Sequence, residues 1–105
     1  MKVFDLQSQK FVEANGWQDF NALIGAEYGT TIEVERVGNT IFALWVDDEG
    51  INRGRLMNMA MTSIVGYPVF GDGIVVAYDI ESGEDACLST HEEFVIEMFA
   101  DDPNY

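Results

Sequence analysis

An apolar run from Ile41 to Val46 is the clearest pattern in the chain. It lies between a Gly-Asn turn signal at residues 38–39 and the acidic segment 47–49, which ends at Gly50. The run contains no charge and no proline, so both of its faces can be buried. It therefore predicts a central strand. A second apolar run, residues 74–80, predicts another strand beside the first.

Alternating segments predict the remaining strands. Residues 31–37 place Ile32 and Val34 on one face and Glu33 and Glu35 on the other, which is typical of a half-exposed strand. The Gly38-Asn39 pair then predicts a two-residue hairpin turn into the central strand. Three further short strands are expected, at residues 1–6 and 10–14, both as edge strands, and at residues 85–88 after a turn at 81–84.

Helical periodicity occurs in three places. Residues 17–26 carry one apolar stripe, which consists of Trp17, Phe20, Leu23 and Ile24. Residues 56–64 have an ambiguous period, but Leu, Met and Ala favour a short helix or an irregular segment packed on the sheet. A last helix is expected from Ser89 or Thr90 to about residue 100, since either residue begins a capping box. Its buried stripe would be Phe94, Val95, Met98 and Phe99.

These elements predict an α+β fold: a mostly antiparallel sheet of four to six strands with two to three short helices packed on it. A chain of 105 residues, 48 % of them apolar, is expected to form a single domain over residues 1–105. No apolar run is long enough to cross a membrane, and the first residues do not resemble a signal peptide. A single cysteine, Cys87, favours a reducing cytosol.

Charge is the most unusual property of the composition. The chain has 19 acidic and 5 basic side chains, for a net charge of −14. Residues 1–55 hold 9 acids and all 5 bases, whereas residues 56–105 hold 10 acids and neither Lys nor Arg. Such a balance argues against direct binding of nucleic acid or of anionic membranes, which require basic surfaces. It favours fast association with a cationic partner.

The sequence gives little support for catalysis or for the binding of a cofactor. His91 is the only histidine and is interpreted as a surface residue, and Cys87 as a buried structural residue whose acidic neighbours disfavour a thiolate. Asp47, Asp48 and Glu49 form a cluster of hard oxygen ligands that suits Ca²⁺ or Mg²⁺, and residues 79–85 imitate only the opening of a calcium loop. No glycine-rich phosphate loop is present. We therefore expect a non-enzymatic protein without a cofactor or a resident metal.

Short motifs between residues 20 and 90 resemble an uncharacterised family of small domains encoded on bacterial plasmids and phages. The segments that carry the resemblance are Leu23-Ile24-Gly25, Ile32-Glu33-Val34, residues 44–50, Asn58-Met59-Ala60, Asp72-Gly73 with residues 74–78, and Leu88-Ser89-Thr90. That family has no established catalytic residues. The resemblance implies an origin on a mobile element rather than a particular reaction.

Charge and resemblance together predict a counter-defence protein. It would bind and inhibit a basic nucleic-acid-handling protein of the bacterial host, such as a CRISPR effector or a restriction enzyme, in the host cytosol by imitating nucleic acid. The predicted partner-binding residues are all acidic: Glu93, Glu97, Asp101, Asp102, Glu92, Glu84, Asp85, Asp47, Asp48 and Glu49. Two alternatives stay open, an oligomeric interaction module that uses the segment with Met57, Met59 and Met61, and a carboxylate protein that binds a divalent metal.

Overall fold

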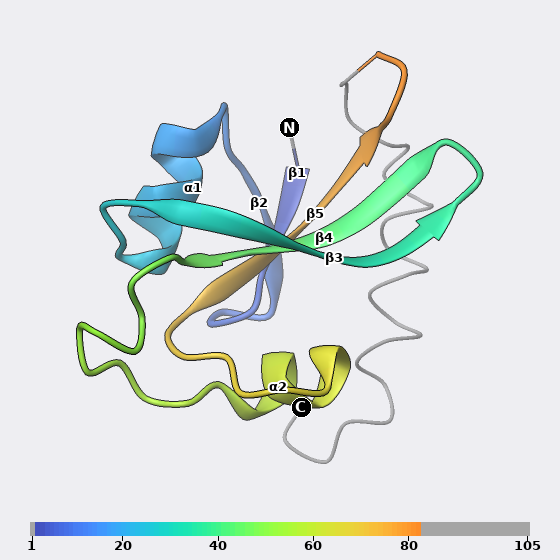
Figure 1. Cartoon of the computed structure of the whole chain (residues 1–105). Helices are drawn as coiled ribbons and strands as arrows, with labels where there is room; N and C mark the ends of the chain where they lie inside the picture. The colour runs from blue at the N-terminus through green and yellow to red at the C-terminus, as the bar shows by residue number, and fades with distance from the viewer. Residues whose placement is uncertain (1, 83–105) are drawn as a thin grey trace.

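The computed structural model describes residues 2–82, which form one antiparallel sheet with a helix on each face (Figure 1). The strand order is β2-β1-β5-β4-β3. The elements are β1 (Lys2–Asp5), β2 (Lys10–Glu13), α1 (Trp17–Ile24), β3 (Gly29–Val37), β4 (Thr40–Asp47), α2 (Met59–Val65) and β5 (Gly73–Asp79). The predicted α+β class with a mostly antiparallel sheet is confirmed.

Strand β4 lies inside the sheet, as its apolar run predicts. It pairs with β3 on one side and β5 on the other. Its residues alternate between the two cores: Phe42, Leu44 and Val46 pack on the side of α2, whereas Ile41 and Ala43 pack on the side of α1. Both faces of this strand are therefore buried, which explains why its sequence is continuously apolar rather than alternating.

Strand β1 corrects one expectation. Residues 1–6 were expected at an edge, but β1 pairs with β2 and also with β5. Val3 is fully buried on the α1 side and Phe4 is buried on the α2 side. The edge positions among the described strands belong to β2 and β3. Only four residues separate β1 from β2, so the two strands form a hairpin. Strand β1 has only four residues, which is too short for its sequence pattern to indicate that it is buried.

Helix α1 covers one face of the sheet, although its buried stripe differs from the predicted one. Phe20 and Ile24 are buried, but Trp17 is 58 % exposed. Asn21 is buried in the same stripe instead. Its amide donates to the carbonyl oxygen of Glu27 at 3.1 Å, and its Oδ1 accepts from the indole Nε1 of Trp45 at 2.8 Å. The helix is thus as predicted, but its buried face includes the polar residue Asn21 and leaves Trp17 exposed.

The β3–β4 hairpin follows the predicted turn. Val37 pairs with Thr40 across Gly38-Asn39, and Gly38 has a positive φ of 62°. A bulge between Glu33 and Glu35 inserts Val34 into β3. Ile32 and Val34 still pack against the core on the α2 side while both glutamates remain exposed. The half-exposed character of this strand is confirmed.

The methionine segment becomes helical only from Met59. Asn58 is the N-cap of α2, and its Oδ1 accepts from the backbone N–H of Met61 at 3.0 Å. Met61 is fully buried under the sheet, whereas Met57 and Met59 are about half exposed. The alternating placement of the three methionines therefore does not reflect a strand. Met57 is extended, Met59 is the first residue of α2, and Met61 belongs to the core.

The strand predicted at 85–88, the helix predicted at 89–100, Cys87 and His91 all lie outside the described residues. Within residues 2–82, neither helix is long and apolar enough to cross a membrane.

Candidate binding groove

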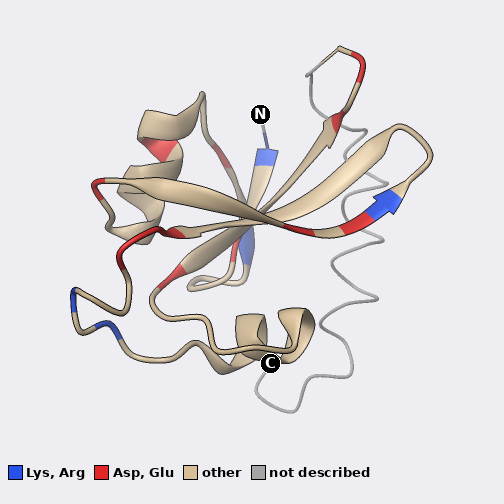
Figure 2. Ribbon diagram, viewed as in Figure 1, with Lys and Arg blue, Asp and Glu red and all other residues tan. Residues whose placement is uncertain are grey.

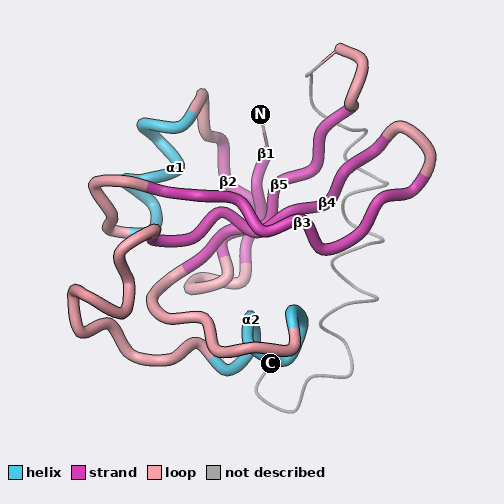
Figure 3. Tube along the Cα trace, in the orientation of Figure 1, coloured by secondary structure: helices cyan, strands magenta, loops and turns pink. Residues whose placement is uncertain are grey.

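Two loops on the same side of the sheet enclose the candidate site. The first joins β4 to α2 through residues 48–58, and the second joins α2 to β5 through residues 66–72 (Figure 3). Between them lies an open groove of about 290 Å³. Ligand pockets for small molecules typically begin at about 300 Å³. The groove is therefore at the lower limit of the size of small-molecule pockets, and it is large enough to admit a side chain.

Backbone contacts hold the two walls of the groove together. The N–H of Asn58 donates to the carbonyl of Val69 at 2.7 Å, and the N–H of Val69 donates to Oγ1 of Thr62 at 3.0 Å. Gly50 lies against Phe70 so closely that a Cβ on it would be 2.6 Å from the carbonyl oxygen of Phe70. Only glycine permits this approach. The groove is thus preformed by the fold.

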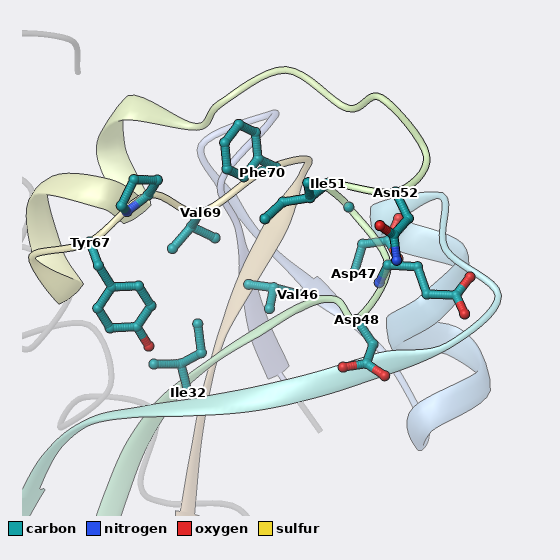
Figure 4. A pocket seen from close by; sticks show the side chains of 12 residues that line it. Ile32, Val46, Asp47, Asp48, Ile51, Asn52, Tyr67, Val69 and Phe70 are labelled. Atoms are coloured by element: carbon teal, nitrogen blue, oxygen red, sulfur yellow. The ribbon is translucent and has the colours of Figure 1, made fainter.

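The lining of the groove changes from apolar to acidic along its length (Figure 4). Ile32, Val46 and Val69 form the apolar floor, and Tyr67 stands beside them. At the other end lie Asp48 and Asn52. Glu49 also lines this acidic end, and Ile51 projects into solvent with 71 % of its surface exposed. Such an arrangement offers contact area and negative charge to one occupant.

Asp47 differs from its two acidic neighbours because its side chain is only 1 % exposed. Its Oδ2 accepts from Nη1 of Arg53 at 2.8 Å and from Nη1 of Arg55 at 3.2 Å. Its Oδ1 accepts from the backbone N–H of Glu49 at 2.9 Å and so shapes the turn after β4. Asp47 is therefore an internal anchor. The prediction that it belongs to an exposed partner-binding surface is wrong.

The same two arginines complete the C-terminal end of α1. The backbone of Gly25, with a φ of 66°, ends the helix in the left-handed conformation. Arg55 Nη2 donates to the carbonyl of Ile24 at 3.2 Å, and Arg53 Nη2 donates to the carbonyl of Gly25 at 3.2 Å. Positive charge at this end of a helix is also favoured by the helix dipole. These hydrogen bonds join the loop after β4 to the C-terminal end of α1.

These contacts balance the charge around the groove. Asp47, Asp72, Arg53 and Arg55 form one connected group, in which Arg55 Nη2 is 3.4 Å from Asp72 Oδ2. Two carboxylates and two guanidinium groups sum to zero. Within the part of the chain that the structure describes, neither Asp48 nor Glu49 forms a side-chain hydrogen bond or ion pair. The acidic end of the groove therefore keeps two uncompensated negative charges.

The predicted site residues divide into three groups. Glu84, Asp85, Glu92, Glu93, Glu97, Asp101 and Asp102 lie outside the described residues. Asp48 and Glu49 lie together on the exposed rim of the groove. Asp47 is buried. Across residues 2–82 no group of three or more His, Cys, Asp or Glu side chains is arranged to hold a metal ion.

Sequence reasoning missed the apolar half of this site. Tyr67 and Ile51 lie in loops, where no periodic pattern marks them, and 52 % and 71 % of their surfaces are exposed. The only signal was local: large apolar residues stand next to Gly and Pro in two loops. Nothing in the sequence indicates that the two loops meet, because the contact of Gly50 with Phe70 spans twenty residues.

Fold and groove together define a class, an acidic α+β domain with a preformed surface groove. Comparison of the chain with protein-family models, with curated proteins and with solved structures finds no match. The resemblance to the family encoded on plasmids and phages therefore stays a prediction.

Proposed function

We propose that this protein is a non-enzymatic counter-defence protein of a mobile element. It binds a basic nucleic-acid-handling protein of the bacterial host and occupies the surface that otherwise holds nucleic acid. A CRISPR effector or a restriction enzyme has the required chemistry, because proteins that hold phosphate backbones do so with clustered Lys and Arg.

The observation that carries the proposal is the internal use of the basic side chains. Arg53 and Arg55 are held by Asp47, Arg36 lies 3.1 Å from Glu33, and Lys2 lies 3.6 Å from Glu13. All five basic side chains of the chain belong to residues 2–82. Four of them are thus in ion pairs with acids of the same chain. Since few cations remain to offset the other carboxylates, the surface presents a net negative field to a partner.

The distribution of the charge within the described residues favours steering over a close copy of DNA. Figure 2 shows acidic residues along the sheet, in its loops and on α1, whereas α2 carries no charged residue. A field of this kind raises the association rate of a cationic partner by long-range attraction. The local contacts must then come from a smaller region, of which the groove is the candidate in residues 2–82.

The experiment is a binding assay with purified CRISPR effectors and restriction endonucleases, in the presence and absence of their DNA. We expect binding that duplex DNA competes away and that weakens strongly between low salt and about 0.3 M salt, where the Debye length is shorter than 10 Å. Charge reversal of Glu93, Glu97, Asp101 and Asp102 should reduce it further. Tight binding that neither salt nor charge reversal changes would contradict the proposal.

One observation favours a second candidate function, an oligomeric interaction module. Leu56 is 87 % exposed, and Met57 and Met59 beside it are 44 % and 50 % exposed. Consecutive apolar residues at a surface commonly mark a protein interface. Sedimentation of the wild type and of a Leu56→Ser/Met59→Ser variant tests it. An exclusively monomeric wild type at high protein concentration rejects this candidate.

A further inference from the structure

The geometry points to an arginine side chain of the partner protein as the occupant of the groove between residues 48–52 and 67–70. This inference rests on the proposed function and specifies where on the chain a basic partner is recognised. It also predicts the local chemistry of the partner: an arginine flanked by an apolar residue, presented on an exposed segment.

The uncompensated negative charge of the groove indicates that its occupant is positively charged. The group of Asp47, Asp72, Arg53 and Arg55 is internally neutral. Asp48 and Glu49 then leave two negative charges at one end of the groove, with no internal partner among residues 2–82. An anionic or neutral polar occupant would leave these charges uncompensated, whereas a cation pairs with them.

The apolar end selects arginine among the cations. Arginine has a long aliphatic stem that can lie on an apolar floor while its charged group remains at the wet end. Its guanidinium group is planar, weakly hydrated and carries several N–H donors in a fixed fork that fits carboxylates, which an ammonium group does not. Val46 and Val69 are 4 % and 5 % exposed and form a firm floor, and the ring of Tyr67 stands at their side.

The preformed walls support a binding role. Gly50 lies so close to Phe70 that a Cβ on it would collide with the carbonyl oxygen of Phe70, and Asn58, Thr62 and Val69 are joined by hydrogen bonds. A site that is already ordered loses little conformational entropy when an occupant enters. Ile51, at 71 % exposure, adds an apolar surface at the mouth of the groove for the neighbour of the arginine.

The test uses amide-resolved NMR of the full chain with the capped peptide Gly-Leu-Arg-Leu-Gly. Peptides with norleucine or lysine in place of arginine serve as comparisons. We expect shift changes concentrated at residues 48–52 and 67–70, with the arginine peptide binding more tightly than lysine and lysine more tightly than norleucine. Equal affinity for the arginine and norleucine peptides, or changes spread evenly over the surface, would overturn the inference.

Two double variants sharpen the test. Asp48→Asn/Glu49→Gln should weaken binding of the arginine peptide by roughly threefold to tenfold, the value of two exposed ion pairs. Glu27→Gln/Glu35→Gln removes the same charge from exposed positions outside the groove and should leave the affinity within about twofold. Equal losses in the two variants would mean that net charge, not the groove, attracts the peptide.

Failure of this inference and failure of the proposed function give different results. If the groove does not prefer the arginine peptide but host nucleic-acid-binding proteins are still captured in competition with DNA, the groove assignment is wrong and the function stands. If the groove binds the arginine peptide and no such host protein is captured, the function is wrong and the groove serves another basic partner.

Discussion

At the scale of the residue, neighbouring acids in one short segment have opposite roles. Asp47 continues the alternation of β4, so its side chain falls on the same side as Ile41 and Ala43 and meets the end of α1. Asp48 and Glu49 come after the strand and face solvent. Their common charge alone suggests that the three acids form one group. The two-residue period of the strand, however, directs Asp47 to the buried side and so separates it from Asp48 and Glu49.

Replacing Asp47 tests its role as an internal anchor. Asp47→Asn removes the charge that pairs with Arg53 and Arg55, whose side chains are 40 % and 21 % exposed. Because water screens part of this interaction, we expect a loss of about 2 kcal/mol in the free energy of unfolding, less than for a fully buried pair. Urea denaturation measures it. Asp72→Asn, at a half-exposed position, should change stability by no more than about 0.5 kcal/mol.

Asn21 gives a second test at this scale. In Asn21→Leu the indole N–H of Trp45 and the carbonyl of Glu27 lose their partner in a partly buried site. An unsatisfied buried group costs about 1–3 kcal/mol, so the free energy of unfolding should fall by this amount although the new residue is apolar. Thermal denaturation is the measurement. Gln18→Leu, on the exposed side of α1, is the control, and an equal loss there would refute the explanation.

At the scale of the element, the loop after β4 and helix α1 stabilise each other. No basic residue lies in the last turn of α1, and Arg53 and Arg55 supply that charge from a loop about thirty residues away. Helix ends require donors for their last carbonyl groups. A long-range contact here replaces a local one, which sequence periodicity cannot reveal.

Hydrogen exchange tests this coupling. In Arg55→Met the carbonyl of Ile24 loses its charged donor, while the stem of the side chain remains. We expect the amides of Gly25 and Ala26 to exchange roughly tenfold faster, because a hydrogen bond from a charged donor contributes about 1.5 kcal/mol. Arg36→Met removes an exposed ion pair on β3 and should leave these amides unchanged. Similar acceleration in both variants would show that the effect is global.

At the scale of the whole molecule, excess negative charge opposes compactness. A net charge of −14 repels itself in the folded state, and salt screens this repulsion. We expect the melting temperature to rise between about 0.02 M and 0.5 M NaCl by roughly 4–8 °C, which corresponds to about 1 kcal/mol for a domain of this size.

Calorimetry at a series of salt concentrations measures this rise. Tetramethylammonium chloride should act as NaCl does, since screening does not depend on the identity of the cation. A melting temperature that is constant or falls with salt would mean that internal ion pairs outweigh the repulsion. Binding of a basic partner should change in the opposite direction and weaken with salt, so the two measurements together identify the charge as surface charge.

The sequence by itself determined the α+β class, the place of β4 inside the sheet, the neighbouring β5, the Gly38-Asn39 hairpin and helix α1, although the central strand of the five described is β5 and not β4. These follow from local periods of two and 3.6 residues, and from turn residues whose conformation needs no distant contact. The net charge is likewise a sum over the residues of the chain and does not depend on how the chain folds.

Only the tertiary structure decided which residues meet. It placed Asp47 between two arginines, put Asn21 against Trp45, moved β1 inside the sheet and joined Gly50 to Phe70 to form the groove. Each of these contacts links segments that are separated by turns or whole elements. Periodicity assigns a residue to a face, but the pairing of faces and loops depends on how the entire chain packs.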